Sequence, residues 1–241
     1  MKSITFIAIT LLAGAIAGTI LGIINQVAVE PYIEQAIELE MQNTAQSGQV
    51  INPAEFAAYR FWQKGGEIVA GTILGLSIGS LYGIVFAYTR GWISGNNNKK
   101  KALIVASIMW LVLFLMPALK YPPNPPTVGN PETIYDRQSL YVAFLAISGF
   151  SALGLAFLYR KIASSNTKKA IIPSAYAAIM AGAYLAMPAN PDPINAPIDL
   201  VIGFRITSGI TISMFWALLG VIFAAFWDKL NPDETARINI R

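Results

Sequence analysis

Six long apolar runs constrain the fold of this chain more strongly than any other feature of its sequence. They cover residues 4–24, 68–88, 102–119, 140–159, 170–189 and 206–227. A helix of about 20 apolar residues spans the roughly 30 Å hydrocarbon core of a bilayer. The third run is the shortest and the fifth contains Pro173, but neither contains a charged residue. We therefore expect an all-α polytopic membrane protein with six transmembrane helices in a single transmembrane domain, residues 1–241.

The distribution of Lys and Arg predicts the orientation of these helices. Twelve of the 17 basic residues flank the runs on one side of the expected bilayer: Lys2, Arg90, Lys99, Lys100, Lys101, Arg160, Lys161, Lys168, Lys169, Lys229, Arg237 and Arg241. Short cytoplasmic loops carry an excess of Lys and Arg. We therefore expect both termini in the cytoplasm and the chain in the cytoplasmic (inner) membrane.

Two residue types are absent from the sequence, and their absence excludes several kinds of chemistry. Without Cys and His, the chain has no disulfides, no thiolate or imidazole metal ligands, and no catalysis that depends on either residue. It also lacks the HExxH, GxSxG and Walker A motifs. Its basic residues are dispersed rather than gathered in one stripe, as nucleic-acid binding would require. We expect neither an enzyme nor a nucleic-acid-binding protein, and no tightly bound cofactor.

Glycine recurs every fourth residue in the first two runs. The two stripes are Gly14, Gly18 and Gly22, and Gly71, Gly75, Gly79 and Gly83. Residues four apart lie on one face of a helix, and the missing side chains let two helix backbones approach closely in lipid. We expect this glycine zipper to pack the first two helices together, within one subunit or across a homodimer. A pore lined by small residues is the alternative.

The segment 29–64 between the first two runs is expected to lie outside the membrane and to be amphipathic. Three glutamates recur there at every fourth position: Glu30, Glu34 and Glu38. They share one helix face if the first helix continues past Pro31, and that face either collects cations or is simply solvated. Asn52 followed by Pro53 is typical of a helix start. The pair Gly65-Gly66 is expected to separate this short helix from the second span.

Two proline-rich loops follow the third and fifth runs. The helix before each loop is expected to end in Met-Pro-Ala, at residues 116–118 and 187–189, and each loop precedes an arginine, Arg137 or Arg205. This similarity predicts that helices 3–4 and 5–6 form a parallel repeat, related by an axis along the membrane normal. An acidic residue precedes each arginine, and we expect Asp136 and Asp199 to be the ion-pair partners.

The outer loops carry the oxygen ligands that hard divalent cations prefer. Proline has no N–H, so the proline loops also present carbonyl groups without neighbouring donors. The candidate metal ligands are Glu30, Glu34, Glu38, Asn124, Glu132, Asp136, Asp192, Asn195 and Asp199. Alternatively, the prolines only rigidify short connections, and the acidic residues only complement the basic opposite side.

The sequence KYPPNPPTVGNPETIYDRQSLY, residues 120–141, resembles the signature loop of CbtA, a family of predicted cobalt-transporter subunits. Residues 27–40 and 70–88 are similar to the acidic segment and the glycine-rich second helix of that family. The positions that match the loop motif are Lys120, Tyr121, Pro122, Asn124, Pro125, Pro126, Gly129, Thr133, Ile134 and Arg137.

The resemblance implies the membrane subunit of a divalent-cation transporter, for an ion such as Co²⁺ that this chain alone does not bind tightly. It also implies a partner, a small single-span subunit whose His-rich end supplies the imidazoles that this chain lacks. Assembly of several copies of the chain is the other expectation. The alternative function is a non-transporting auxiliary or scaffold subunit of a larger membrane protein complex.

Overall fold

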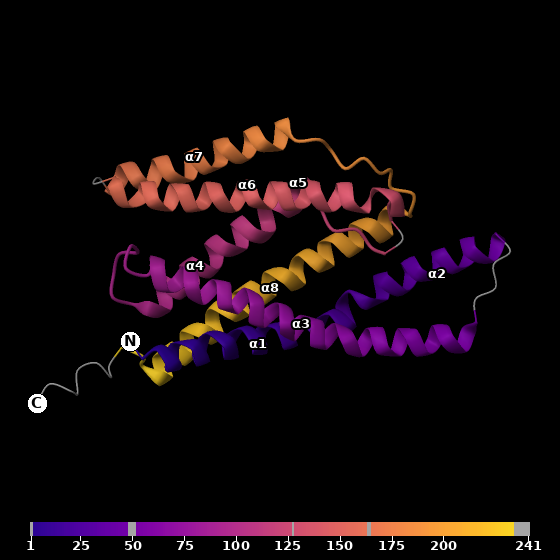
Figure 1. The fold of residues 1–241 in the computed structure, drawn as a ribbon, viewed down its shortest axis with the longest axis horizontal. Coiled ribbons are helices and arrows are strands. Elements are labelled where there is room, and N and C mark those ends of the chain that lie inside the picture. The colour runs from indigo at the N-terminus through magenta and orange to yellow at the C-terminus, as the bar shows by residue number, and fades with distance from the viewer. Residues whose placement is uncertain (1, 48–51, 127, 163–164, 234–241) are drawn as a thin grey trace, which may run out of the picture. The chain divides into compact units, whose positions relative to one another are not determined.

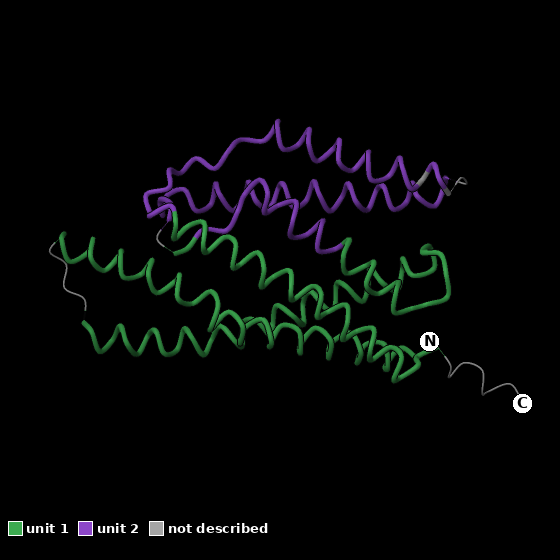
Figure 2. The backbone as a smooth tube through the Cα atoms, turned by 180° about the vertical axis from the view of Figure 1, so that it is seen from behind, with its two compact units in different colours: residues 1–108, 125–127, 199–241 green, residues 109–124, 128–198 purple. Residues whose placement is uncertain are grey.

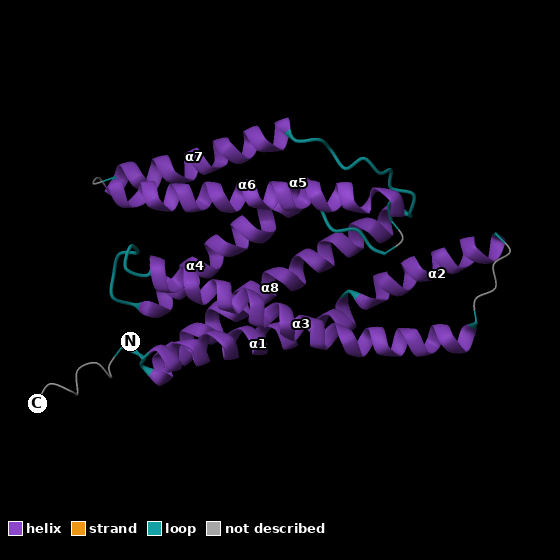
Figure 3. Ribbon diagram, in the orientation of Figure 1, coloured by secondary structure: helices purple, strands orange, loops and turns teal. Residues whose placement is uncertain are grey.

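The computed structural model describes residues 2–47, 52–126, 128–162 and 165–233, and every regular element in these ranges is helical (Figure 1 and Figure 3). The α-helices are α1 (Ser3–Ala28), α2 (Glu30–Gln46), α3 (Pro53–Thr89), α4 (Asn98–Trp110), α5 (Met116–Lys120), α6 (Ile134–Lys161), α7 (Ser165–Ala186) and α8 (Ile198–Leu230). A π turn, Leu111–Leu115, joins α4 to α5, and a 3-10 turn, Pro131–Thr133, precedes α6.

Six helices are long and apolar enough to cross a membrane, which confirms the predicted number. They are Ser3–Ala28, Pro53–Thr89, Asn98–Lys120, Pro131–Lys161, Lys169–Ala186 and Ile198–Leu230. The third of these runs from α4 through the π turn into α5. The all-α fold class is therefore as the apolar runs predict.

The second spanning helix is longer than its apolar run. Asn52 caps it, because its side chain accepts a hydrogen bond of 3.1 Å from the Ala54 N–H. From Pro53 the helix then continues through Gly65 and Gly66 to its end. The break expected at this glycine pair is wrong, since a helical glycine costs only about 1 kcal/mol relative to alanine. The helical hydrogen bonds on either side offset that cost.

The helices α1 and α2 are separated by Val29 alone. Pro31 lacks an N–H, and its ring crowds the preceding helical turn. Val29 still keeps a helical conformation, with φ −100° and ψ −38°. The chain therefore bends here and resumes as α2, which carries the three glutamates of the outer segment.

The chain forms two compact units (Figure 2). Unit 1 comprises residues 1–108, 125–127 and 199–241, and unit 2 comprises residues 109–124 and 128–198. In unit 1, α1 and α3 lie side by side. Aromatic side chains of α3 and α8 pack together in the core of this unit. The rings of Tyr82 and Phe86 each lie 4.9 Å from that of Phe223, centroid to centroid. In unit 2, α6 and α7 lie side by side.

The two ends of the described chain meet at one end of unit 1. The Lys2 N–H donates to the Pro232 carbonyl over 3.0 Å. Arg90, just after α3, forms an ion pair with Asp233 at 2.9 Å. The start of α1, the end of α3 and the end of α8 therefore lie together.

Candidate functional site

The two proline loops meet in unit 2 at the carboxylate of Asp192. This carboxylate accepts a hydrogen bond from the Asn130 N–H at 2.9 Å and one from the Thr133 hydroxyl at 2.7 Å. The Nε atom of Arg137 lies 3.0 Å from it, and the Asp192 side chain is only 6% exposed. Asp192 belongs to the second loop and its three partners to the first loop and α6. We call these four residues the loop latch.

Arg137 also binds the backbone of the first loop. Its guanidinium donates to the Asn130 carbonyl at 3.0 Å and to the Val128 carbonyl at 3.3 Å. The sequence indicated the adjacent Asp136 as its ion-pair partner, but the pair that forms is with Asp192. Neighbouring helix positions point about 100° apart, so Asp136 faces away and is exposed.

Gly129 is the residue that lets the loop fold around this ion pair. Its φ is +107°, a left-handed backbone conformation that side chains disfavour. A Cβ atom here would also lie 2.7 Å from Asp192 Oδ2 and 2.8 Å from Arg137 Cζ. Glycine is therefore required both for the turn and for the close approach of the two side chains.

Lys120 and Tyr121 bind the C-terminal end of α7. The Lys120 ammonium donates to the Tyr184 carbonyl at 2.8 Å and lies 4.6 Å from the centre of the Tyr184 ring. A cation at this position complements the negative end of the helix dipole. The Tyr121 hydroxyl donates to the Pro188 carbonyl at 2.7 Å. Burial raises the pKa of Tyr121 further above neutral pH, where a tyrosine hydroxyl is in any case protonated and able to donate.

The structure does not gather the other candidate ligands of the proline loops around one point. Glu132, Asp136 and Asn195 are exposed, and Asn124 is half-buried. Asp199 lies in the first turn of α8 and belongs to unit 1. Within the described ranges, no group of three or more Asp and Glu residues could hold a metal ion.

The glutamates of α2 lie against basic residues of α3. Glu30 forms ion pairs with Arg60 and with Lys64, and its side chain is 7% exposed. Lys64 also binds Glu34. This hydrogen bond lowers the pKa of Glu34. Glu38 is exposed. Two of the three carboxylates on this face therefore already have cationic partners, which the first part of α3 supplies.

The glycine stripes of α1 and α3 face each other at backbone distance. A Cβ atom on Gly18 would lie 2.8 Å from the Gly75 Cα, and one on Gly79 would lie 2.8 Å from the Gly14 Cα. Thr19 and Thr72 share a hydrogen bond of 2.8 Å beside this contact. No side chain fits between these two helices at these positions.

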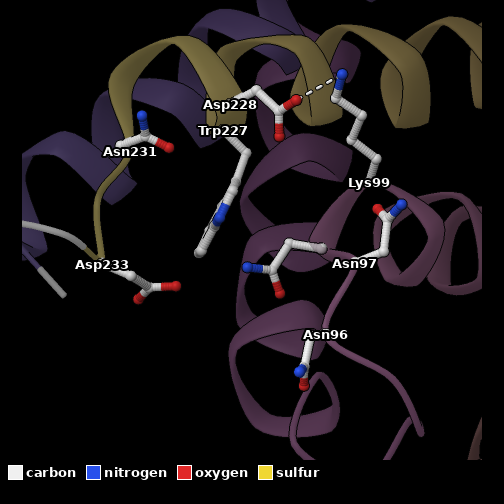
Figure 4. Close-up of a pocket in the computed structure, with 8 residues that line it drawn as sticks. Asn96, Asn97, Lys99, Trp227, Asp228, Asn231 and Asp233 are labelled. Atoms are coloured by element: carbon white, nitrogen blue, oxygen red, sulfur yellow. Dashed lines mark ion pairs between the residues drawn. The ribbon is translucent and has the colours of Figure 1, made fainter.

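A polar pocket of about 570 Å³ opens at the end of unit 1 where the two chain ends meet (Figure 4). Its lining residues are Asn96, Asn97, Asn98, Lys99, Trp227, Asp228, Asn231 and Asp233. Lys99 pairs with Asp228, and Arg90 pairs with Asp233 and lies 5.0 Å from the centre of the Trp227 ring. The pocket therefore offers mainly neutral amides, and none of the candidate ligands lies in it.

Sequence reasoning missed the role of Asn130. This residue caps the turn before α6, because its side chain accepts the Glu132 N–H at 3.0 Å, and its own N–H reaches Asp192. The signal was present, since Asn130-Pro131-Glu132 repeats the helix-start pattern of Asn52-Pro53. Its partner in the second loop, however, depends on how α7 packs.

Comparison with models of protein families matches residues 3–228 to the family described as probable cobalt transporter subunit, CbtA. The matched range includes both proline loops, the loop latch, the first five apolar helices and the sixth as far as residue 228. No curated protein and no solved structure matches the chain.

Proposed function

This chain belongs to the CbtA family of probable cobalt transporter subunits, and on that basis we propose that its paired proline loops form the ion entrance of a divalent-cation transporter. The family is one of transporter subunits rather than enzymes, and the chain is a multi-pass membrane protein. Cobalt is the ion that the family description favours. The proposal assigns the entrance to residues of unit 2.

The observation that carries the proposal is the loop latch. Asp192 ties the second proline loop to the first, so the loops form one rigid structure at the end of the α6–α7 pair. Glu132 and Asp136 stand exposed at the start of α6 beside this structure. Exposed carboxylates concentrate cations from solution, whereas the buried and paired Asp192 holds the loops in place.

We assign the latch to the outer face of the inner membrane and both termini to the cytoplasm. The excess of Lys and Arg on the opposite side supports this orientation. The oxygen ligands of the described loops suit a weakly held, hydrated ion, since tight capture of late transition metals requires nitrogen or sulfur ligands. A second subunit therefore supplies the tight ligands. A small single-span partner or another copy of this chain would fill that role.

Uptake of Co²⁺ into proteoliposomes tests this proposal, with Ni²⁺ and Mg²⁺ as competing ions. Removing both exposed charges, in Glu132→Gln with Asp136→Asn, is expected to lower the uptake rate about threefold to tenfold, because the local cation concentration falls. The matched control removes two exposed carboxylates of the outer segment, in Glu40→Gln with Glu55→Gln, and should change uptake much less. An equal uptake rate in the two double variants would show that Glu132 and Asp136 do not attract the ion to its entrance.

A non-transporting scaffold subunit is the second candidate function. The close backbone packing of α1 against α3 favours it, because such a contact stabilises helix association and leaves no space for an ion between the two helices. The same proteoliposomes distinguish the two. Absence of uptake with and without co-purified partner subunits, in protein that is folded, would support the scaffold function.

A further inference from the structure

The third spanning helix contains a break in its hydrogen-bond pattern near its outer end. Residues Leu111–Leu115 form a π turn, in which the Met116 N–H donates to the Leu111 carbonyl, five residues back. The next donor in this register would be the nitrogen of Pro117, but proline has no N–H. The Val112 carbonyl is therefore left without a donor from its own helix.

Ser148 of α6 supplies the missing donor. Its hydroxyl donates to the Val112 carbonyl at 2.6 Å, and its side chain is completely buried. The Tyr176 hydroxyl of α7 lies 2.7 Å from the same Ser148 oxygen. Ser148 has one hydroxyl hydrogen and gives it to Val112, so Tyr176 is the donor of this second bond. All three residues belong to unit 2.

The π turn determines which way the end of this helix faces. One additional residue in a turn rotates everything that follows by about 100° around the helix axis. After this turn, α5 ends at Lys120, which binds the Tyr184 carbonyl in the last turn of α7. The next residue, Tyr121, binds the Pro188 carbonyl just beyond α7. With an ordinary α-helical turn, the same two side chains would point away from α7.

We propose that Ser148 and Tyr176 are positioning residues for the entrance. By providing the donor that Pro117 lacks, they stabilise the π turn and so fix the rotation with which Lys120 and Tyr121 reach α7. The consequence for ion passage rests on the proposed function, but the rotation itself does not. It is therefore tested by measurements that need no transport.

The first test is a double-mutant cycle on the apparent Tm of the purified protein. Ser148→Ala leaves the buried Val112 carbonyl unpaired and is expected to lower Tm by about 3–8 °C. In a Pro117→Ala background, residue 117 has an N–H, and the decrease in Tm caused by Ser148→Ala should be at most half as large. Additive effects would show that Ser148 acts by packing alone and would overturn the proposal.

The second test measures the rotation. The chain has no cysteine, so Leu119→Cys gives a single labelling site on a side chain that is 58% exposed. Adding Ser148→Ala or Tyr176→Phe is expected to change the maleimide labelling rate at least about threefold, because the helix end turns by about 100°. The control is Ser107→Ala, whose hydroxyl donates only to Leu103 of its own helix. An unchanged rate in the Ser148 variant would overturn the proposal, whether or not the protein transports cobalt.

Discussion

The Asp192 carboxylate and the Arg137 guanidinium lie 3.0 Å apart and join two loops that are more than 50 residues apart in the sequence. The Asp192 side chain is 6% exposed and that of Arg137 is 24% exposed. Removing one partner of a largely buried pair leaves the other charge uncompensated, which costs more than the loss of a surface pair.

Asp192→Asn is therefore expected to destabilise the protein by about 2–3 kcal/mol, a value reduced from fully buried pairs because Arg137 is partly exposed. The measurement is thermal unfolding in detergent. Asp136→Asn is the matched control, because it removes the neighbouring exposed carboxylate and should change stability by less than about 0.5 kcal/mol. A larger effect at Asp136 than at Asp192 would contradict the latch.

Gly129→Ala is expected to destabilise the same junction by about 2 kcal/mol or more. The alanine backbone must adopt a φ of +107°, and its methyl group would lie 2.7 Å from Asp192 Oδ2. Backbone strain and a steric clash therefore both destabilise the variant. Gly182→Ala in α7 is the control, because nothing lies within 4 Å of its Cβ position. That substitution should be neutral or stabilising by up to about 1 kcal/mol, since alanine favours helix.

The helices of this protein are predictable from the sequence, because each spanning segment is set by its own apolar residues. The loop latch is not predictable in the same way. Arg137 has Asp136 beside it in the sequence, and only the packing of α6 against α7 brings Asp192 to it instead. The partners of Lys120 and Tyr121 are not predictable either, because they are backbone carbonyls, which a sequence pattern does not distinguish.

The outer segment shows the same limit. Spacing alone placed Glu30, Glu34 and Glu38 on one face, but it gave no sign that Arg60 and Lys64 of the next helix would lie against that face. The Gly65-Gly66 pair was also predicted to end a helix, but α3 continues through it. The π turn was hidden because the third run is apolar on all sides, so its residues carry no periodicity that would reveal one additional residue.

Lys120→Met is expected to destabilise the protein by about 1 kcal/mol, through loss of the hydrogen bond to the Tyr184 carbonyl and of the favourable position at the end of α7. The Lys120 ammonium also lies 4.6 Å from the centre of the Tyr184 ring. In a Tyr184→Leu background, the loss of stability caused by Lys120→Met should be smaller by about 0.5 kcal/mol, the size of an exposed cation–π contact. Thermal unfolding measures both losses. Equal losses in the two backgrounds would show that the Tyr184 ring does not stabilise the Lys120 ammonium.

The pair of Lys64 and Glu34 gives a pH-dependent contribution whose direction follows from the lowered pKa of Glu34. A carboxyl with a folded pKa below its unfolded value of about 4.3 stabilises the fold above that value and loses the effect as the pH falls through the folded pKa. The stability difference between the protein and its Glu34→Gln variant should therefore be present at pH 6 and shrink below about pH 4. Urea unfolding at a series of pH values measures this difference. A difference that grows on acidification would show that the pair does not form.

The contact between α1 and α3 gives the largest expected effect on folding. In Gly18→Ala, the new Cβ would lie 2.8 Å from the Gly75 Cα, and backbone atoms cannot move aside as a flexible side chain can. The two helices must separate, so we expect a loss of about 2–4 kcal/mol, at the upper end of overpacking effects. Gly66→Ala on α3 is the control, since nothing lies within 4 Å of its Cβ position.

Thermal unfolding and size-exclusion chromatography of both variants provide the measurement. If Gly18→Ala matched Gly66→Ala in both, the close approach of these helices would not contribute to stability, and their packing would have to depend on the Thr19–Thr72 hydrogen bond and the aromatic core instead.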